Sequence, residues 1–396
     1  MIKSIYQKTV IKIKNHPKKS ILGLVFLVFY YFSLPSVLFD VPYSTVILSK
    51  EGTLLDAKIS TDGQWRFPAQ DSLPSHYKTC VLMYEDQHFR YHWGFNPVSI
   101  FNAFRQNQKA KTVVRGGSTL TQQVIRLHRK NKKRTYFEKF TEIFLATRLE
   151  FRHSKEKILN LYAAHAPFGG NVIGIEMASW RYFGTDAHNL SWAEAATLAV
   201  LPNAPSLIYP GKNQEKLRIK RNKLLLKLLE NNKIDQVTYE SAILEPLPQK
   251  PFQLPKIAPH LLELAYQKHQ GKRITTTIDL EVQNRVNALV NNYYQNYKQN
   301  EIYNMAVMIV DVETRNIVAY IGNTATDKQH QKDVDIINAP RSTGSILKPL
   351  LFAAMLDDGE ILPNTLVADV PTQISGYSPQ NFDFTYDGAV PAKRAL

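Results

Sequence analysis

The chain has 396 residues, of which 44% are hydrophobic and 21% are charged. This length and composition predict an ordered protein with two or more domains and exclude a disordered chain. The only cysteine is Cys80, which excludes an internal disulfide and a zinc site built on cysteines. The formal net charge is +15, and residues 1–19 carry six lysines and no acidic residue.

Residues 20–39 form a run of 20 without a charged side chain. This length matches the roughly 20 residues that a helix needs to cross a membrane. With the lysines before the run and Asp40 after it, the positive-inside rule places the N-terminus in the cytoplasm. A cleaved signal peptide is the alternative, but the run is over-long for one and no small-residue cleavage site follows. We therefore expect a basic cytoplasmic tail at 1–19 and a single-pass anchor at 20–39.

The residue pattern then changes along the chain. Residues 44–68 indicate short strands separated by glycine turns, and apolar residues at helical spacing dominate from 73 to 232. Ser191 and Glu194 predict a capping box on a helix that stops at Pro202. The four prolines Pro246, Pro248, Pro251 and Pro255 are typical of a linker. A strand leading into a helix and two further strands follow, so a helical unit precedes the opening of an α/β unit.

The stretch YEDQHFRYHWG, residues 84–94, combines several groups that bind metals or move protons. His88 and His92 stand four apart, so on a helix they would share a face and form part of a metal site. A general base with supporting groups, drawn from Glu85 and Asp86, is the second interpretation. A polar helix end without chemistry is the third.

The stretch RGGSTLTQQVIRL, residues 115–127, predicts an anion site. Gly116–Gly117 allows the backbone to approach a ligand closely. Ser118 or Thr119 caps the following helix, with Gln122 completing a capping box to Thr119. The bare N–H groups of a helix start attract anions.

Residues 105–134 carry ten lysines and arginines and no acid. A solvated basic face is the simplest interpretation of this charge, and nucleic acid is a second. A chain anchored outside the membrane meets little nucleic acid, so we expect no such partner. A membrane-bound diphosphate or an anionic lipid headgroup explains both the charge and the anchor.

Two further pairs of residues are candidates for catalysis. Glu85 and Glu142 lie 57 positions apart on separate helical segments, and two carboxylates facing a cleft perform glycosidic chemistry. The sequence leaves open whether they converge or lie on the surface. Ser345 and Lys348 have the S-x-x-K spacing, which on a helix places hydroxyl and amine on one face.

Together these motifs resemble those of class A penicillin-binding proteins, the bifunctional peptidoglycan synthases of bacteria. EDQHFRYHWGFNP is similar to the family's E-D-x-x-F-x-x-H-x-G motif, and RGGSTLTQQ is similar to G-G-S-T-x-T-Q-Q. EKFTEIFLATRLE is similar to the R-K-x-x-E segment, and two later stretches resemble the fourth and fifth motifs. DGQWRFP, APFGGN and STGSILKP are most like the penicillin-binding protein 1C branch. The resemblance covers about residues 43–396.

The resemblance implies a transmembrane helix, a mainly α, lysozyme-like glycosyltransferase domain of family 51, and the incomplete start of an α/β penicillin-binding transpeptidase domain. The corresponding boundaries are 43–244 for the glycosyltransferase, 245–272 for a linker and 273–396 for the transpeptidase part. The implied substrates are lipid II and the growing glycan strand at the outer face of the plasma membrane. Other cell-wall synthesis proteins are the further partners expected.

By the same resemblance, Glu85 is the general base, with Asp86 and His92 supporting it. Glu142 serves the donor site, directly or through a divalent cation, Mg²⁺ or Mn²⁺, on the diphosphate. Arg126, Lys139 and the helix start stabilise the leaving diphosphate. The residues implied to bind substrate are Asp86, Phe89, His92, Gly116, Gly117, Ser118, Thr119, Gln122, Gln123, Arg126 and Lys139.

This sequence departs from the family pattern at several positions. Asn96 replaces an aspartate, Glu138 replaces the arginine of R-K-x-x-E, and Ala164 replaces the asparagine of L-Y-x-N. The chain ends at Leu396, before any S-x-N or K-T-G motif. We therefore expect an incompetent transpeptidase, with β-lactam binding only where that domain is complete. A non-catalytic scaffold that binds lipid II and a glycan-cleaving hydrolase are the alternative functions.

Overall fold

The computed structural model describes residues 17–70, 72–110, 116–132, 135–203 and 211–395. They divide by their contacts into two compact units, Met1–Ile337 and Asn338–Leu396. Part of the predicted basic tail lies outside the described residues, as do four basic residues of the 105–134 stretch: Lys111, Arg115, Lys133 and Arg134. The domain boundaries at 244 and 272 stay predictions.

The first described helix, α2 (Pro17–Phe32), lies in the predicted anchor and exposes most of its apolar side chains. Its Tyr30 is an exception, because the ring packs edge-on against Phe144 at 5.2 Å between centroids. Tyr30 also donates a 3.1 Å hydrogen bond to the Thr147 hydroxyl. Within the described ranges, no helix is both long enough and apolar enough to cross a membrane.

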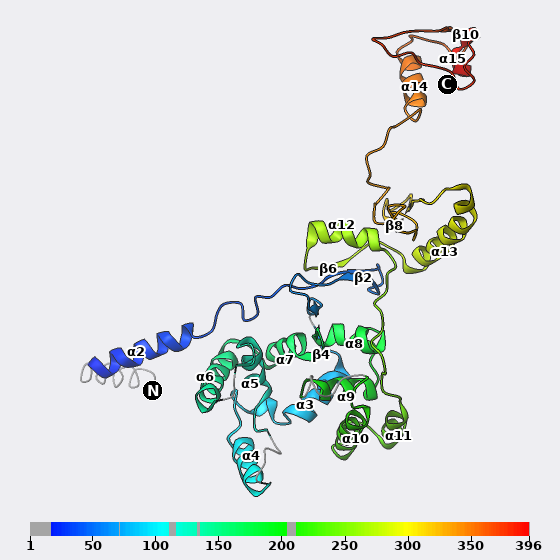
Figure 1. Cartoon of the computed structure of the whole chain (residues 1–396). Coiled ribbons are helices and arrows are strands. Elements are labelled where there is room, and N and C mark those ends of the chain that lie inside the picture. Colours follow the sequence, from blue (N-terminus) through cyan, green and yellow to red (C-terminus); the bar gives the residue numbers. More distant parts are fainter. Residues whose placement is uncertain (1–16, 71, 111–115, 133–134, 204–210, 396) are drawn as a thin grey trace. The chain divides into compact units, whose positions relative to one another are not determined.

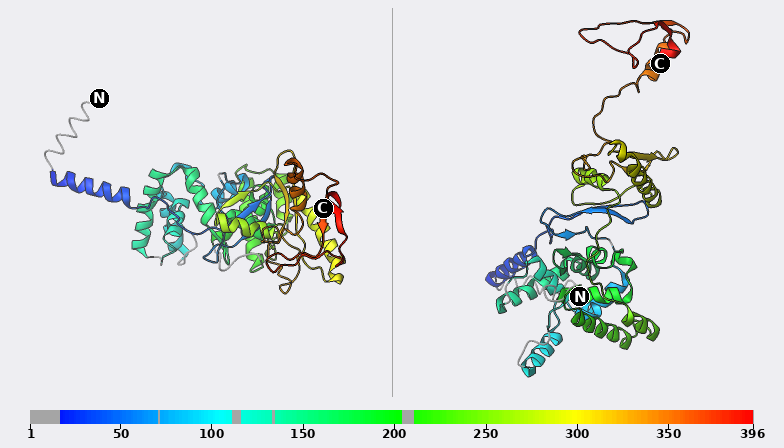
Figure 2. Two further views of the ribbon diagram at one scale, coloured as in Figure 1. Left: turned by 90° about the horizontal axis from the view of Figure 1, so that it is seen from above. Right: turned by 45° about the vertical axis from the view of Figure 1, so that its right-hand side comes forward.

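A three-stranded sheet joins distant parts of the first unit. Strand β1 (Thr45–Leu48) pairs antiparallel with β2 (Leu54–Lys58), as the glycine turn between them predicts, and parallel with β6 (Arg273–Thr275). Helix α12 (Pro259–His269) lies along this sheet in Figure 1 and in the right-hand view of Figure 2. Its Leu262 joins Ile47 and Leu55 in a buried core. The stretch predicted as a linker therefore contains a packed helix.

The larger core of this unit is helical, as the 3.6-residue periodicity predicts. It is shared by helices from several motifs, and Tyr77, Val124, Leu159 and Leu198 are at most 1% exposed. The helices of this layer in chain order are α3 (Ser75–Glu85), α4 (Pro97–Ala110), α5 (Leu120–His128), α6 (Tyr136–Arg152), α7 (Lys155–His165), α8 (Ile175–Phe183), α9 (Trp192–Val200), α10 (Gln214–Glu230) and α11 (Gln236–Leu244). Short 3-10 turns lie at Phe89–Tyr91, Ala187–Asn189 and Leu201–Asn203, and β3 (Trp65–Arg66), β5 (Val172–Ile173) and β4 (Pro167–Gly169) form a small sheet.

Side-chain caps start these helices where the sequence places hydroxyl residues. Ser191 forms the predicted capping box with Glu194 at α9. Thr119 caps α5 by accepting a hydrogen bond from the Gln122 backbone N–H. The predicted box at Thr119 is not completed, however, because the Gln122 side chain accepts a 2.7 Å hydrogen bond from Lys139 instead.

The rest of the first unit follows the predicted strand–helix–strand order. Helix α13 (Leu280–Tyr297) packs on the hairpin of β7 (Val307–Val310) and β8 (Ile317–Ile321), after which the unit ends. The buried Gln283 joins helix to strand, since its side-chain oxygen accepts a 2.7 Å hydrogen bond from the Tyr320 N–H. The 3-10 turn Lys298–Asn300 closes α13.

The second unit contains α14 (Lys348–Asp357), the antiparallel strands β9 (Leu366–Asp369) and β10 (Gly388–Pro391), and α15 (Ala392–Ala395). Ser345 lies in the turn before α14, and Lys348 is the first residue of that helix. The Ser345 carbonyl accepts a 3.1 Å hydrogen bond from the Lys348 N–H across this turn, and the shared face of the two side chains stays a prediction. Helix α14 begins at Lys348 because the next residue, Pro349, is favoured in the first turn of a helix.

Candidate active site

The first unit contains a cleft of about 1740 Å³ between the end of α3, the loop after it, the start of α5 and α10. Many of the residues implied to bind substrate line it, although they come from separate stretches of the chain. Those on its wall are Glu85, Asp86, His92, Gly116, Gly117, Ser118, Thr119, Gln123 and Arg126.

Glu85 is the last residue of α3 and is half-buried. Its Oε2 accepts a 2.7 Å hydrogen bond from Gln123 Nε2, while Oε1 is buried without a partner among the described residues. Burial raises the pKa of Glu85; the hydrogen bond from Gln123 opposes the rise, and the negative charge of Asp86 adds to it. A carboxylate with a raised pKa and an uncommitted oxygen is suited to accept a proton.

The metal hypothesis for residues 84–94 assumed a helix that continues past His88. Helix α3 instead ends at Glu85, so His88 and His92 do not share a helix face. His92 Nε2 donates a 2.9 Å hydrogen bond to Asp86 Oδ2, and His88 is exposed. In the described part of the chain, no cluster of three or more histidine, cysteine or acidic residues is placed to hold a metal ion.

Asp86 and His92 join the end of α3 to the start of α5. Asp86 Oδ2 accepts a 3.0 Å hydrogen bond from the backbone N–H of Leu120, at the first turn of α5, where a negative charge is favoured. His92 Nδ1 accepts from the Gly94 N–H at 3.2 Å, and the Thr119 hydroxyl donates to the Gly94 carbonyl at 2.7 Å. These bonds fix Asp86 next to Glu85.

The second carboxylate, Glu142, lies on α6 with 5% of its side chain exposed. Arg126 donates to both of its oxygens, at 2.8 and 2.9 Å, and Lys139 Nζ lies 3.5 Å from Oε2. Both cations also donate to the Ser118 hydroxyl, at 3.1 and 2.7 Å. Two cationic side chains and a hydroxyl thus converge at the start of α5, an arrangement that suits an anionic group.

Gln122, Gly117 and Phe89, three other residues implied to bind substrate, make packing contacts. Gln122 is fully buried and holds Lys139, as described above. A Cβ on Gly117 would lie 3.0 Å from the Cα of Ile100, so the close approach of α4 favours glycine at this position. A Cβ on Gly116 would meet nothing within 4 Å. Phe89 is buried, with its ring centroid 6.0 Å from that of His92.

The three departures from the family pattern have local partners. Arg129 donates to both oxygens of the buried Glu138 and keeps the pKa of that carboxyl below its usual range. Glu138 and Arg129 therefore form an ion pair without net charge, and neither residue lines the cleft. Asn96 accepts a 3.1 Å hydrogen bond from the Ser99 N–H at the start of α4. The backbone of Ala164 lies close to Gly174: a Cβ added at Gly174 would be 2.7 Å from the Ala164 carbonyl oxygen.

Lys220 and Tyr162 also line the cleft, although no sequence motif indicates them. The positive charge of Lys220 acts to lower the pKa of Glu85. Tyr162 is buried, and its hydroxyl has no partner among the described residues. Both belong to amphipathic helices, where a lysine or tyrosine at these positions gives no local signal.

Residues 52–229 match the family model Transglycosylase. The chain is 35% identical to penicillin-binding protein 1C of Escherichia coli K12 over 91% of this chain and 47% of that protein. It is 30% identical to penicillin-binding protein 2D of Bacillus subtilis 168 over 91% of this chain and 54% of that protein. The crystal structure of penicillin-binding protein 1A from Haemophilus influenzae aligns with TM-score 0.38 and 15% identity, over 90% of this chain and 60% of that one.

Residues 52–229 therefore form a transglycosylase domain, and over most of its length the chain is similar to penicillin-binding proteins, in agreement with the resemblance seen in the motifs. It spans about half the length of the curated relatives it matches.

Proposed function

We propose that this chain is a peptidoglycan glycosyltransferase that polymerises lipid II into β-1,4 glycan strands and releases undecaprenyl diphosphate. The observation that carries the proposal is Glu85: a carboxylate with a raised pKa and an unpartnered oxygen, in the wall of a large cleft. The transglycosylase match over residues 52–229 supports the same reaction class.

In the proposed reaction, Glu85 accepts the proton of the 4-hydroxyl group on the acceptor's terminal GlcNAc. The freed oxygen attacks C1 of the donor MurNAc, the bond from C1 to the diphosphate breaks, and the configuration at C1 inverts. Gln123 holds Oε2 of Glu85, which leaves Oε1 for the proton. A base at hydrogen-bond reach contributes about 10²–10⁴-fold to such a step.

The leaving diphosphate gains negative charge as the bond breaks. Arg126, Lys139 and Ser118 are proposed to stabilise it, because they converge at the start of α5 and are preorganised by Glu142. The divalent cation expected there stays a prediction. Both oxygens of Glu142 already accept hydrogen bonds from Arg126, so Glu142 does not fit as a metal ligand unless it gives up these bonds, and the proposed reaction contains no step through a metal.

We further propose that the chain is anchored in the bacterial plasma membrane, with the N-terminus in the cytoplasm and the cleft outside. The uncharged run 20–39, the lysines before it and the exposed apolar side chains of α2 support this. Carbonate extraction of bacterial membranes tests the anchor: the chain should remain in the membrane pellet, and removal of residues 1–39 should release it.

Ser345 and Lys348 are proposed to be the S-x-x-K motif of a penicillin-binding transpeptidase, in keeping with the names of the relatives. In this chain both side chains are exposed, and Ser345 stands in a turn outside α14. We expect no covalent labelling of Ser345 by a fluorescent penicillin. Labelling that is lost in Ser345→Ala would contradict this expectation.

The main test is polymerisation of labelled lipid II by the full chain and by Glu85→Gln. We expect Glu85→Gln to lower the rate by about 100-fold or more, because an amide accepts no proton. Glu230→Gln, at an exposed position in the last turn of α10, is the matched control and should retain full activity. Equal polymer from wild type and Glu85→Gln would remove Glu85 as the base, and no polymer from wild type would favour the scaffold alternative.

A further inference from the structure

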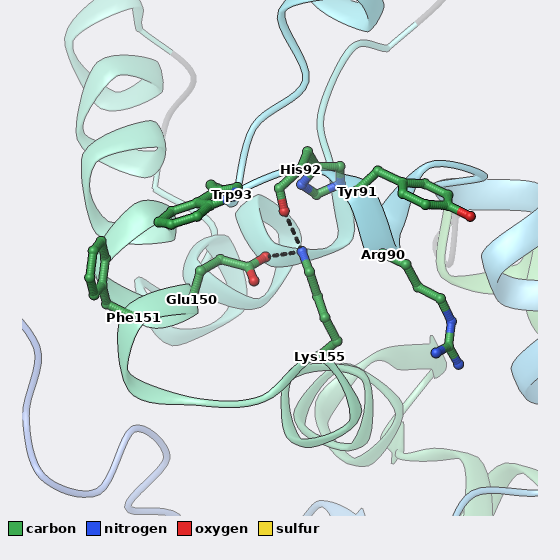
Figure 3. A pocket seen from close by; sticks show the side chains of 7 residues that line it. All are labelled: Arg90, Tyr91, His92, Trp93, Glu150, Phe151 and Lys155. Atoms are coloured by element: carbon green, nitrogen blue, oxygen red, sulfur yellow. Dashed lines mark hydrogen bonds and ion pairs between the residues drawn. The ribbon is translucent and has the colours of Figure 1, made fainter.

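A small pocket of about 350 Å³ lies on the other side of the loop that carries His92. Figure 3 shows Lys155 reaching into it from the start of α7, toward the Glu150 carboxylate and the His92 carbonyl. The Glu150 and Lys155 side chains are 8% and 23% exposed, so this ion pair is largely removed from water. Neither residue is part of the site described above.

One ammonium group therefore connects several elements. Lys155 Nζ donates to the His92 carbonyl at 2.6 Å and to Glu150 Oε1 at 2.7 Å, and it lies 4.6 Å from the centre of the Phe89 ring. The same Glu150 oxygen accepts a 2.6 Å hydrogen bond from the Thr121 hydroxyl on α5. The loop 89–92 is thus tied to α5, α6 and α7 at a single point.

The hydrogen bond from Lys155 holds His92, whose ring donates a hydrogen bond to Asp86. The backbone of His92 is held by Lys155, and the ring is held by Gly94 and Asp86. Because Nδ1 accepts from the Gly94 N–H, the ring proton lies on Nε2 and points at Asp86 Oδ2. The negative charge of Asp86 raises the pKa of Glu85. A shift of His92 weakens its hydrogen bond to Asp86 and therefore changes the effect of that charge on Glu85.

We propose that Lys155 is a positioning residue for the base: by holding the His92 carbonyl, with Glu150 orienting its ammonium, it keeps the His92–Asp86 hydrogen bond beside Glu85. This inference rests on the proposed role of Glu85. The competing account is that Lys155 only neutralises the largely buried Glu150. The two accounts differ in what happens when both charges are removed together.

The activity test uses the full chain and four variants: Lys155→Met, Glu150→Gln, the two combined, and Lys157→Met as the matched control. Lys157 is exposed and lies two positions further along α7. Lys155→Met should lower the rate of lipid II polymerisation by about tenfold or more, since small displacements of catalytic groups are costly. It should also move the acid limb of the pH–rate profile to higher pH, because Asp86 loses compensation and raises the pKa of Glu85 further.

Glu150→Gln still offers an oxygen to Lys155 and should leave the acid limb unmoved. The double variant should behave like Lys155→Met. Recovery of wild-type rate and pH profile in the double variant would overturn the proposal, because Lys155 would then act only as the partner of Glu150. Lys155→Arg, which can still donate to the His92 carbonyl, should recover part of the rate.

A second readout does not depend on turnover, so it separates this inference from the proposed function. In wild type, ¹⁵N NMR of labelled histidines should show His92 as a single Nε2–H tautomer, assigned by comparison with His92→Gln. We expect this signature to be lost in Lys155→Met and in the double variant and kept in Glu150→Gln. An unchanged tautomer signal in Lys155→Met would overturn the proposal even if the chain polymerises no lipid II.

Discussion

Gln123 Nε2 donates a 2.7 Å hydrogen bond to Oε2 of Glu85, and this bond divides the carboxylate into one held and one uncommitted oxygen. Three residues further along α5, Arg126 holds Glu142. One helix face therefore places the proposed base and the proposed anion site at a fixed separation, because positions three apart are neighbours on a helix.

Gln123→Leu should move the acid limb of kcat/KM for lipid II polymerisation to higher pH. The hydrogen bond from Gln123 lowers the pKa of Glu85, so its removal lets burial raise that pKa further. Glu85 is then protonated, and inactive as a base, at a higher pH than in wild type. Gln236→Leu, on exposed α11, is the control, and an unmoved or lowered limb in Gln123→Leu would contradict the assignment.

Arg126→Met should lower the free energy of unfolding by about 3 kcal/mol, because the buried Glu142 loses the cation that donates to both of its oxygens and keeps Lys139 only at 3.5 Å. Adding Glu142→Gln should recover most of this stability, since the uncompensated charge is gone. Urea denaturation measures both effects. Polymerisation should stay impaired in the double variant, and full recovery of activity would argue against Arg126 at the diphosphate.

Gly94→Ala should destabilise the fold by about 2 kcal/mol or more. Gly94 has φ of +90°, and an added Cβ would lie 2.7 Å from the backbone carbon and oxygen of Ala146 on α6. Gly52→Ala is a matched control, because Gly52 has φ of +85° with open space around it. The difference between the two melting temperatures isolates the steric clash. Equal losses of stability in the two variants would show that the backbone of α6 moves to relieve the clash.

Asp56→Asn should stabilise the protein above pH 6 and leave it unchanged near pH 3.5. Asp56 lies in β2 and is 4% exposed, and burial raises its pKa from 3.8 to about 6. An acid with a raised pKa contributes stability below its unfolded pKa, and this contribution is lost as pH rises from about 4 to 6. The variant should therefore gain about 3 kcal/mol at neutral pH, measured by denaturation at several pH values. A gain of the same size at pH 3.5 would contradict this cause.

The sequence predicted most helices of the first unit because their apolar residues repeat with the helical period and hydroxyl residues precede them. At residues 86–92 the spacing of His88 and His92 would place both on one face only if the helix continued, and α3 ends at Glu85. Local spacing describes a face only where the backbone continues in one conformation. The stretch predicted as a linker, 245–272, carries the expected prolines and also contains α12, which packs on the sheet.

The order of motifs and the residue types were thus determined by the sequence alone, including the transglycosylase domain, the two glutamates and the basic stretch around α5. Only the tertiary structure decided which groups meet. Asp86 contacts Leu120 across 34 positions, Arg129 neutralises Glu138, and Lys155 reaches the His92 carbonyl across 63 positions. Such contacts depend on how helices pack and where loops close, and a hydrogen bond leaves no periodic trace in either of the stretches that it joins.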